Sequence, residues 1–356
     1  MIIDCHNHVL ATALPPGHDL FVREMRAPGH RRAGRLPAYR AATEQDWAGL
    51  ESDLDPIDPA TLIADHLSAG VDRATVLAVA PSTYTSYGER GTIDLGRVTD
   101  VDGPLEVAKS NDYIAALIRK HPELIGMAAV NPRFRGVDRA RTELTRAVEE
   151  LGLRGLKLYP MYDHYEPADR DLAFPIFERA NELGIGVMVH MGTSSAKDTV
   201  FDYGRPGGLD EVARHFPDLP LLVCHVGFPW VDECLAMVAR HDNTYVDISM
   251  FATKTSRRGL YEFLVRAQQL GCPLSRICWG TDYPGGGKPA VLLPKFALVN
   301  DAADDGAPVS TTDLAQMLGG NWARFAGIEG WSEQETVDQL AAWEPRWRAA
   351  ESVTTN

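Results

Sequence analysis

The chain has 356 residues, a formal net charge of −14 and a charged-residue content of 24%. Nucleic-acid surfaces and polybasic membrane patches require clustered Lys and Arg, so an acidic balance of this size argues against both kinds of partner. The sequence also has no uninterrupted run of about 18 apolar residues, the length that a membrane span needs. We therefore expect a small-molecule substrate and neither a nucleic-acid nor a membrane partner.

The chain contains five cysteines, an odd number whose spacing fits neither a disulfide framework nor a Cys-x2-Cys metal site. Free buried thiols in a reducing compartment are the simpler interpretation. The opening MIIDCHNH has neither the basic region nor the long apolar region of a secretory signal. These features predict a cytoplasmic location.

Short apolar runs alternate with helical patterns along the chain, which is typical of repeated strand–helix units around a parallel sheet. Strands are predicted at 2–5, 74–79, 124–130, 154–160, 186–192, 220–227, 244–249 and 276–282. Helices are predicted at 59–70, about 105–120, 136–152, about 169–183, within 207–217, at 231–240 and 257–271, and from about 289 and 312. Eight strands with intervening helices indicate an α/β protein, a (β/α)8 TIM barrel that forms a single domain over residues 1–356.

Two segments are additions to this barrel. Residues of about 9–58 are expected to form a long insertion, rich in Pro, Gly and Arg, with one short helix near 43–50. Loops of this length inside a compact domain are usually functional. The segment of about 331–356 is expected to form a C-terminal helix that packs outside the barrel.

Polar residues end several of the predicted strands, where the active sites of such barrels lie. The first strand ends in DCHNH, and strand alternation places Asp4, His6 and His8 on one face, with Cys5 and Asn7 on the other. His190 ends the fifth predicted strand, His225 the sixth and Asp282 the eighth. Because the eighth strand of a barrel closes beside the first, Asp282 is expected to lie beside His6 and His8.

These imidazoles and the carboxylate predict a metal site. Each residue alone has a plainer interpretation, a surface or core histidine or a turn aspartate, but several of them converging at strand ends favour metal binding. Histidine with carboxylate suits Zn²⁺ and also Mn²⁺ or Fe²⁺. We therefore expect one divalent ion, with zinc preferred.

The same motifs carry a family resemblance that covers residues 1 to about 328. They resemble the amidohydrolase superfamily, in the amidohydrolase-related (amidohydrolase 2) branch that includes lactonases, hydratases and non-oxidative decarboxylases. The resemblance implies metal ligation by His6, His8, His190 and Asp282, catalytic acid–base roles for His225 and Asp282, and a homodimer or larger homo-oligomer. The matching segments are DCHNH, RGLKLYP, VMVHMG, LLVCHVG, NTYVDIS, WGTDYP and LGGNWARFAGI.

Lys157 has two interpretations. It should face the barrel interior if Leu156 and Leu158 face the helices. Binuclear relatives hold a carbamylated lysine at the end of the fourth strand, which would make Lys157 a bridging ligand. The alternative is an interior cation that pairs with a carboxylate, either Asp4 or that of a substrate. Asp4 could instead be the acceptor that orients a ligand histidine.

Weaker candidates concern substrate binding. The guanidinium groups of Arg133 and Arg205 could bind a substrate carboxylate from loops, although a solvated surface role is the plainer interpretation. Tyr159, Tyr162, Phe228 and Trp230 follow strand ends and could line a pocket for an aromatic substrate, or simply pack at the top of the barrel. Asp247 in YVDIS could be a structural acceptor for the sixth-strand region, and alternation is expected to turn Cys5 and Cys224 toward the helices.

Two reactions fit this set of residues, because fold and ligands do not determine the reaction. The first is hydrolysis of an ester, lactone or amide of a small carboxylate or aromatic substrate by metal-activated water. The alternative is non-oxidative decarboxylation of a hydroxylated aromatic or dienoic acid. The turn HVGFPWVDE has a single glycine where decarboxylases of this branch are often glycine-rich, which favours hydrolysis. A barrel that keeps the ion without turnover is disfavoured by the intact residue set.

Overall fold

The computed structural model describes residues 1–9, 58–79, 111–194, 199–304, 306 and 308–354, so the expected insertion of about 9–58 lies almost wholly outside the described residues. Eight parallel strands pair in sequence order, each with the next. They are β1 (Ile3–Asn7), β2 (Arg73–Leu77), β3 (Leu124–Ala129), β4 (Gly155–Leu158), β5 (Gly186–Val189), β6 (Leu221–Val223), β7 (Thr244–Asp247) and β8 (Ile277–Cys278).

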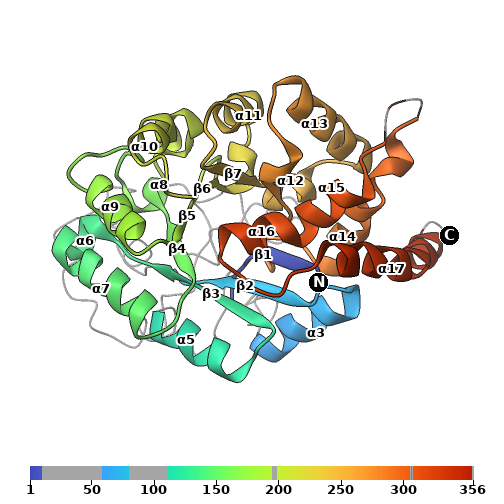
Figure 1. Ribbon diagram of the computed structural model, residues 1–356, viewed down its shortest axis with the longest axis horizontal. Coiled ribbons are helices and arrows are strands. Elements are labelled where there is room, and N and C mark those ends of the chain that lie inside the picture. The colour runs from blue at the N-terminus through green and yellow to red at the C-terminus, as the bar shows by residue number, and fades with distance from the viewer. Residues whose placement is uncertain (10–57, 80–110, 195–198, 305, 307, 355–356) are drawn as a thin grey trace, which may run out of the picture.

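Hydrogen bonds between β1 and the chain just after β8 close the sheet on itself. The Cys5 amide donates to the Trp279 carbonyl at 3.2 Å, and the Asp282 amide donates to the His6 carbonyl at 2.8 Å. The His8 amide then donates to the Tyr283 carbonyl at 2.8 Å. The predicted TIM barrel is therefore confirmed, and the helices surround it as Figure 1 shows.

Helices cover the outside of the barrel because their apolar faces pack on the outward side chains of the strands. The short α16 is the exception, since its Trp322 and Phe325 pack with the interior residues at the end where the strands begin. The helices are α3 (Pro59–Ala69), α5 (Asn111–Lys120), α6 (Pro132–Arg135), α7 (Val137–Glu149), α8 (Pro160–Asp163), α9 (Phe174–Glu182), α10 (Asp210–His215), α11 (Val231–Arg240), α12 (Ser249–Lys254), α13 (Arg257–Gln269), α14 (Pro289–Ala297), α15 (Thr311–Ala315), α16 (Asn321–Phe325) and α17 (Glu333–Thr354).

The C-terminal helix α17 packs on the outside of the barrel, as the sequence predicted. Its Trp347 indole donates a hydrogen bond to the Ala69 carbonyl at 3.1 Å, and Gln339 donates to the Gly70 carbonyl at 3.0 Å. Both acceptors lie at the end of α3, so α17 holds the turn between that helix and β2. These contacts therefore fasten α17 to the end of the barrel where the strands begin.

Strand alternation sorts side chains between the interior and the helices. Leu156 and Leu158 of β4 belong to the helix-facing core, which leaves Gly155 and Lys157 pointing inward, as predicted. Interior residues of the other strands are small or apolar and form one buried cluster. That cluster includes Ile3, Cys5, Leu77, Ile125, Met127, Met188, Leu222, Cys224, Tyr245 and Cys278.

A β-bulge in β1 changes the facing that simple alternation predicts. Between Asp4 and Asn7 the strand advances three residues while its partner β2 advances two. Ile3 and Cys5 pack inside the barrel by regular alternation, while Asp4 and Asn7 both contact His66 of α3, so the bulge turns His6 to the same side as Cys5. The expectation that Asp4 shares a face with the two histidines, and that Cys5 faces the helices, is therefore wrong. The expectation that His6 shares a face with His8 is right.

Two strands end earlier than their apolar sequences suggest. β6 stops at Val223 because His225 and Val226 adopt left-handed backbone angles, with φ of 60° and 54°. After β8, Asp282 is also left-handed, with φ of 54°. Non-glycine residues rarely adopt this conformation, and where they do it often marks a functional site. In both places the turn occurs where a polar residue was predicted to close the strand.

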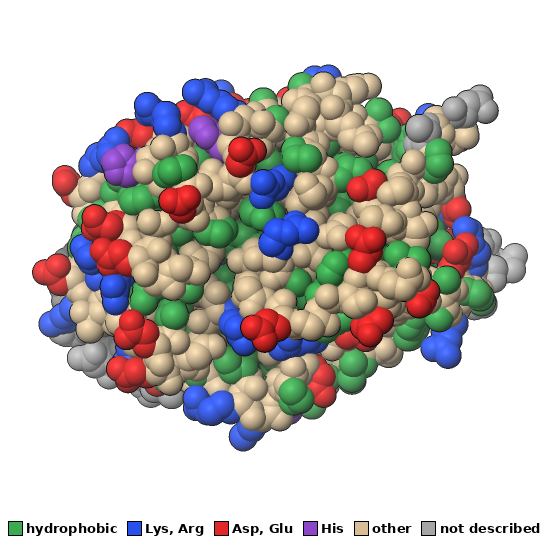
Figure 2. All heavy atoms as spheres, viewed as in Figure 1, with side chains coloured by type: hydrophobic (Ala, Val, Ile, Leu, Met, Phe, Trp, Pro, Cys, Tyr) green, Lys and Arg blue, Asp and Glu red, His purple; other side chains and the backbone are tan. Residues whose placement is uncertain are grey.

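On the face shown in Figure 2, acidic and basic side chains are interspersed, without one large basic field. Within the described part of the chain, none of the helices combines the length and the apolar character that crossing a membrane requires.

We predict that Gly280→Ala destabilises the barrel. A methyl group there would lie 2.9 Å from Cys5 Sγ and 3.1 Å from His6 Cβ, which would force β1 away from the chain after β8. Chemical denaturation should show a loss of about 1–3 kcal/mol in the free energy of unfolding. Gly285→Ala is the matched control, because its methyl group would lie 3.6 Å from the nearest atom. Equal stabilities for the two variants would contradict this explanation of the closure.

Candidate metal centre

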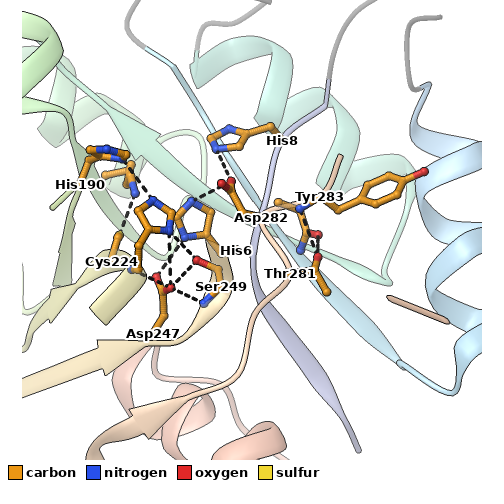
Figure 3. Close-up of polar contacts among 12 residues, drawn as sticks. His6, His8, His190, Cys224, Asp247, Ser249, Thr281, Asp282 and Tyr283 are labelled. Carbon is orange, nitrogen blue, oxygen red and sulfur yellow. Dashed lines mark hydrogen bonds and ion pairs between the residues drawn. The ribbon is translucent and has the colours of Figure 1, made fainter. Parts of the chain in front are cut away.

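The core of the candidate site is a carboxylate that faces two imidazoles at the closing seam of the barrel. Asp282 Oδ1 lies 3.4 Å from His6 Nε2 and 3.3 Å from His8 Nε2. Figure 3 shows the three side chains pointing toward one another from β1 and from the turn after β8. The structure therefore places Asp282 beside His6 and His8, as the barrel closure predicted.

His190 and His225 stand next to each other beside this group. His225 Nε2 lies 3.2 Å from His190 Nδ1, and the His225 ring centroid is 4.8 Å from that of His6. Tyr162 packs edge-on against His190, with ring centroids 4.8 Å apart. The left-handed turn at His225 brings its imidazole against those of His6 and His190.

Asp247, at the end of β7, connects these parts of the site. Its Oδ2 lies 3.0 Å from His6 Nδ1, and its Oδ1 accepts the backbone N–H groups of His225 and Ser249, each at 3.0 Å. Its carboxylate is fully buried. From the sequence we expected Asp247 to be an acceptor for the sixth-strand region, which the bond from the His225 amide confirms. Its contact with the His6 ring was not expected.

The hydrogen-bond pattern assigns the tautomers of three histidines. The Ser249 hydroxyl donates its one proton to Asp247, because a carboxylate only accepts. Ser249 Oγ must then accept from His225 Nδ1, 2.7 Å away, which leaves His225 Nε2 as an acceptor. His190 Nδ1 therefore donates to His225 Nε2, and His6 Nδ1 donates to Asp247. As a result, His6 and His190 each keep the lone pair on Nε2 available.

Burial favours the neutral form of these imidazoles. Desolvation, joined by neighbouring positive groups such as Lys157, lowers the pKa of His6, His190 and His225 well below 6.5. Burial alone would raise the pKa of Asp282, but the attraction of His6 and His8 outweighs it and the pKa is lowered. Neutral imidazoles and an ionised carboxylate are the forms that bind a metal cation.

Unpaired buried nitrogens show that the residues fit a cation. Among the described residues, His190 Nε2 and His8 Nδ1 are buried without a hydrogen-bond partner. Nitrogen or oxygen atoms of His6, His225 and Asp282 also lie within 4.8 Å of one another. The lone pair of His6 Nε2 faces a carboxylate oxygen, an arrangement that a positive ion between them would stabilise. His6, His225 and Asp282 thus form one group of donors, which His8 contacts through Asp282 and His190 contacts through His225.

Asp4 joins β1 to the chain that follows β8. Its carboxylate accepts the Thr281 amide at 3.0 Å and the Thr281 hydroxyl at 2.6 Å, and it also contacts His66 at 3.1 Å. It accepts the His6 backbone amide at 3.1 Å, whereas Asp247 contacts the His6 ring. Asp4 therefore positions the β1 backbone, and the expectation that it orients a ligand imidazole is corrected by the bulge described above.

Lys157 is fully buried in the barrel interior, and its ammonium contacts a thiol. Lys157 Nζ lies 2.8 Å from Cys224 Sγ and 5.3 Å from the Tyr159 ring centroid. The expected pairing with Asp4 is not found, because Asp4 faces α3. Burial raises the pKa of Cys224 well above its usual value, although Lys157 opposes the shift, so the thiol stays protonated. Cys224 was expected to face the helices; it faces the interior because it follows Leu222 by two residues, and strand alternation places both on the inner face.

A cavity of about 230 Å³ opens over the donor residues. Of the substrate-binding candidates, Tyr162 and Phe228 line it, whereas Arg133, Arg205, Tyr159 and Trp230 are absent from its described lining. Arg205 binds Glu233 at 2.9 Å, and the Tyr159 hydroxyl donates to the Ala78 carbonyl at 2.9 Å. The sequence analysis did not single out four further lining residues, because no motif distinguishes them. The lining includes His190, His225, Asp282, Tyr162, Thr193, Ser194, Phe228, Met250 and Lys254.

Comparisons with known proteins concern the family and the fold of the chain. The model of a family described as Amidohydrolase matches residues 3–328. A 2-amino-3-carboxymuconate-6-semialdehyde decarboxylase from Dictyostelium discoideum is 24% identical over 252 residues, which is 62% of this chain and 66% of that protein. The chain thus matches slightly less than two thirds of this curated relative's length.

Two solved structures share the fold. The crystal structure of 5-carboxyvanillate decarboxylase from Sphingomonas paucimobilis has a TM-score of 0.62 at 16% identity, covering 92% of this chain and 99% of that one. A dihydroxybenzoic acid decarboxylase from Polaromonas, crystallised with manganese and 2-nitroresorcinol, has a TM-score of 0.58 at 16% identity, covering 93% and 98%. At these identities the likeness establishes the barrel alone.

We predict that Ser249→Ala releases the tautomer of His225. The variant leaves the buried Nδ1–H without its acceptor, which should cost about 1–3 kcal/mol in the free energy of unfolding. Nitrogen-15 NMR of histidine-labelled, zinc-loaded protein should show the Nδ1–H form of His225 in the unsubstituted protein and in Ser249→Thr, and a mixture in Ser249→Ala. An unprotonated Nδ1 in the unsubstituted protein would refute the assignment.

Proposed function

Because this chain belongs to the amidohydrolase family, we propose that it is a metal-dependent carboxy-lyase that releases CO2 from a small hydroxylated aromatic or dienoic acid. The observation that carries this proposal is the ring-sized cavity directly over the donor residues. The curated relative and both solved structures described above are named as decarboxylases, which supports the same reaction class.

We assign the metal to His6, His8, His190 and Asp282. This set leaves His225 free for proton transfer, in agreement with its hydrogen bond to Ser249. A divalent ion held there would polarise substrate oxygens and lower the pKa of a coordinated water. Manganese is named with the Polaromonas structure, and imidazole with carboxylate also suits zinc, so both ions are candidates.

The size of the cavity limits the substrate. An engineered cavity of about 150 Å³ in another protein holds benzene, so about 230 Å³ accommodates one substituted ring or a diene of similar length. Phe228 and Met250 offer apolar surface for its carbon skeleton, and the hydroxyl groups of Thr193 and Ser194 offer hydrogen bonds. An ester or amide with two large halves would not fit within this volume.

The protonation state of His225 suits the proton transfer that decarboxylation needs. Its Nε2 accepts from His190 Nδ1, and when a substrate hydroxyl group replaces His190 as the partner, Nε2 can take the hydroxyl proton while Nδ1 stays bonded to Ser249. The imidazolium then delivers this proton to the ring carbon that carries the carboxylate. As the carbon–carboxylate bond breaks, its electron pair returns to the ring and CO2 leaves. The hydroxyl proton thus ends on the carbon and the product leaves as a phenolate.

Hydrolysis is the second candidate, and one observation favours it. The Asp282 carboxylate lines the cavity and its pKa is lowered, so it can accept a proton from a water molecule that attacks a carbonyl group. A small lactone would meet the same limit on volume. We rank this reaction second. Its support in the sequence was the turn with the single glycine Gly227, and a glycine side chain cannot transfer a proton.

We predict different outcomes for two histidine variants. His190→Ala should lose bound metal, because it removes the unpaired Nε2, whereas His225→Ala should keep the metal and lose turnover by roughly 100- to 10,000-fold. Metal content measured by inductively coupled plasma mass spectrometry, alongside turnover, separates the two effects. Loss of metal from His225→Ala alone would reverse the two assignments.

We also predict that the metal-loaded protein releases CO2 from a hydroxylated aromatic acid. A panel of hydroxybenzoic and dienoic acids, and a second panel of small lactones and esters, would be incubated with the protein and with His225→Ala. Evolved CO2 and the decarboxylated product should appear only with the unsubstituted protein and the first panel. Hydrolysis of the second panel without any CO2 would overturn the carboxy-lyase assignment in favour of the alternative.

A further inference from the structure

The cavity carries one permanent positive charge. Among the described lining residues, Lys254 is the only lysine or arginine. Within that part of the chain, no carboxylate lies at ion-pair distance from its ammonium group. Lys254 is exposed whereas the metal donors are buried, so its charge lies toward the solvent side of the cavity.

Helix α12 sets the spacing between Lys254 and the acid–base residue His225. Helix α12 begins at Ser249, which contacts His225, and ends at Lys254. Five residues of helix separate the two backbones by about 7.5 Å along the helix axis. Lys254 Nζ also lies 5.2 Å from the centroid of the Phe228 ring, which itself lines the cavity. The helix therefore works as a spacer between the acid–base group and the cation.

A lysine at the end of a helix can simply complement the helix dipole. That explanation accounts for the position in the sequence but not for the direction of the side chain, which leans over Phe228 into the cavity wall. Other cations near this end of the barrel are already paired, for example Arg257 with Glu351 and Arg258 with Asp304. Lys254 thus has a charge that no carboxylate among the described residues neutralises.

We propose that Lys254 is an anion-binding residue that recognises a second acidic group of the substrate, at the end opposite the metal donors. This inference rests on the proposed function and adds the substrate's charge pattern to it. The substrate is a ring-sized diacid: one oxygen-bearing end is directed to His6, His8, His190 and Asp282, and a carboxylate at the other end pairs with Lys254. Neither Arg133 nor Arg205, the cations favoured by the sequence, lines the described cavity.

A binding experiment tests this without turnover. Benzene-1,3-dicarboxylate and benzoate differ by one carboxylate, and their affinities for the zinc-loaded full chain would be measured by isothermal titration calorimetry. Lys254→Met removes the charge at similar size, and Lys254→Arg keeps it. Lys288→Met is the matched control, because Lys288 is exposed, lies outside the cavity lining and pairs with Asp65 at 3.8 Å.

The protein should bind the dicarboxylate at least about tenfold more tightly than benzoate, as a charge-assisted hydrogen bond provides. Lys254→Met should abolish this preference and leave benzoate binding unchanged, while Lys254→Arg and Lys288→Met should retain it. Equal affinities for the two acids, binding of neither, or an unchanged preference in Lys254→Met would overturn the proposal. A preference that depends on Lys254, in a protein that releases no CO2, would refute the carboxy-lyase function alone.

Discussion

The buried carboxylate of Asp247 is the contact on which the geometry of the site depends. It accepts the His6 ring from β1, the His225 amide after β6 and the Ser249 amide at the start of α12. Three segments far apart in the sequence therefore meet at one side chain. Because the Ser249 hydroxyl also donates to it, the carboxylate determines which ring nitrogen carries the proton in His6, His225 and His190. Metal binding and proton transfer are thus coupled through a group that contacts neither substrate nor, in our assignment, the ion.

The backbone supports this arrangement by departing from regular strands where function requires it. A bulge in β1 lets Asp4 fasten the barrel seam while His6 faces the centre. Left-handed residues end β6 and follow β8, and they bring His225 and Asp282 over the same cavity. Regular alternation would have placed Cys224 and His225 on opposite faces. The strain of these few positions is confined to the strand ends, while the interior below them is filled by small and apolar side chains.

The sequence predicted the barrel, the order of its strands and the meeting of His6, His8 and Asp282, because apolar runs mark buried strands and barrel closure brings the last strand to the first. It could not predict that His6 and His225 face the same side as the residues before them, Cys5 and Cys224, since a bulge or a left-handed turn leaves no signature in hydrophobic periodicity. Lys254 was missed for another reason. A lysine at a helix end looks like any solvated cation until the fold shows which cavity it lines. For the same reason the sequence favoured Arg133 and Arg205 as substrate-binding cations, although neither lines the described cavity.

The central claim is that His6, His8, His190 and Asp282 share one cation. Anomalous diffraction at the manganese edge, from crystals of the full chain grown with Mn²⁺, tests it most directly. The account predicts a single strong peak within bonding distance of His6, His8, His190 and Asp282, with His225 adjacent but not coordinated. A peak elsewhere, the absence of any peak, or a direct bond from His225 in place of His190 would contradict it.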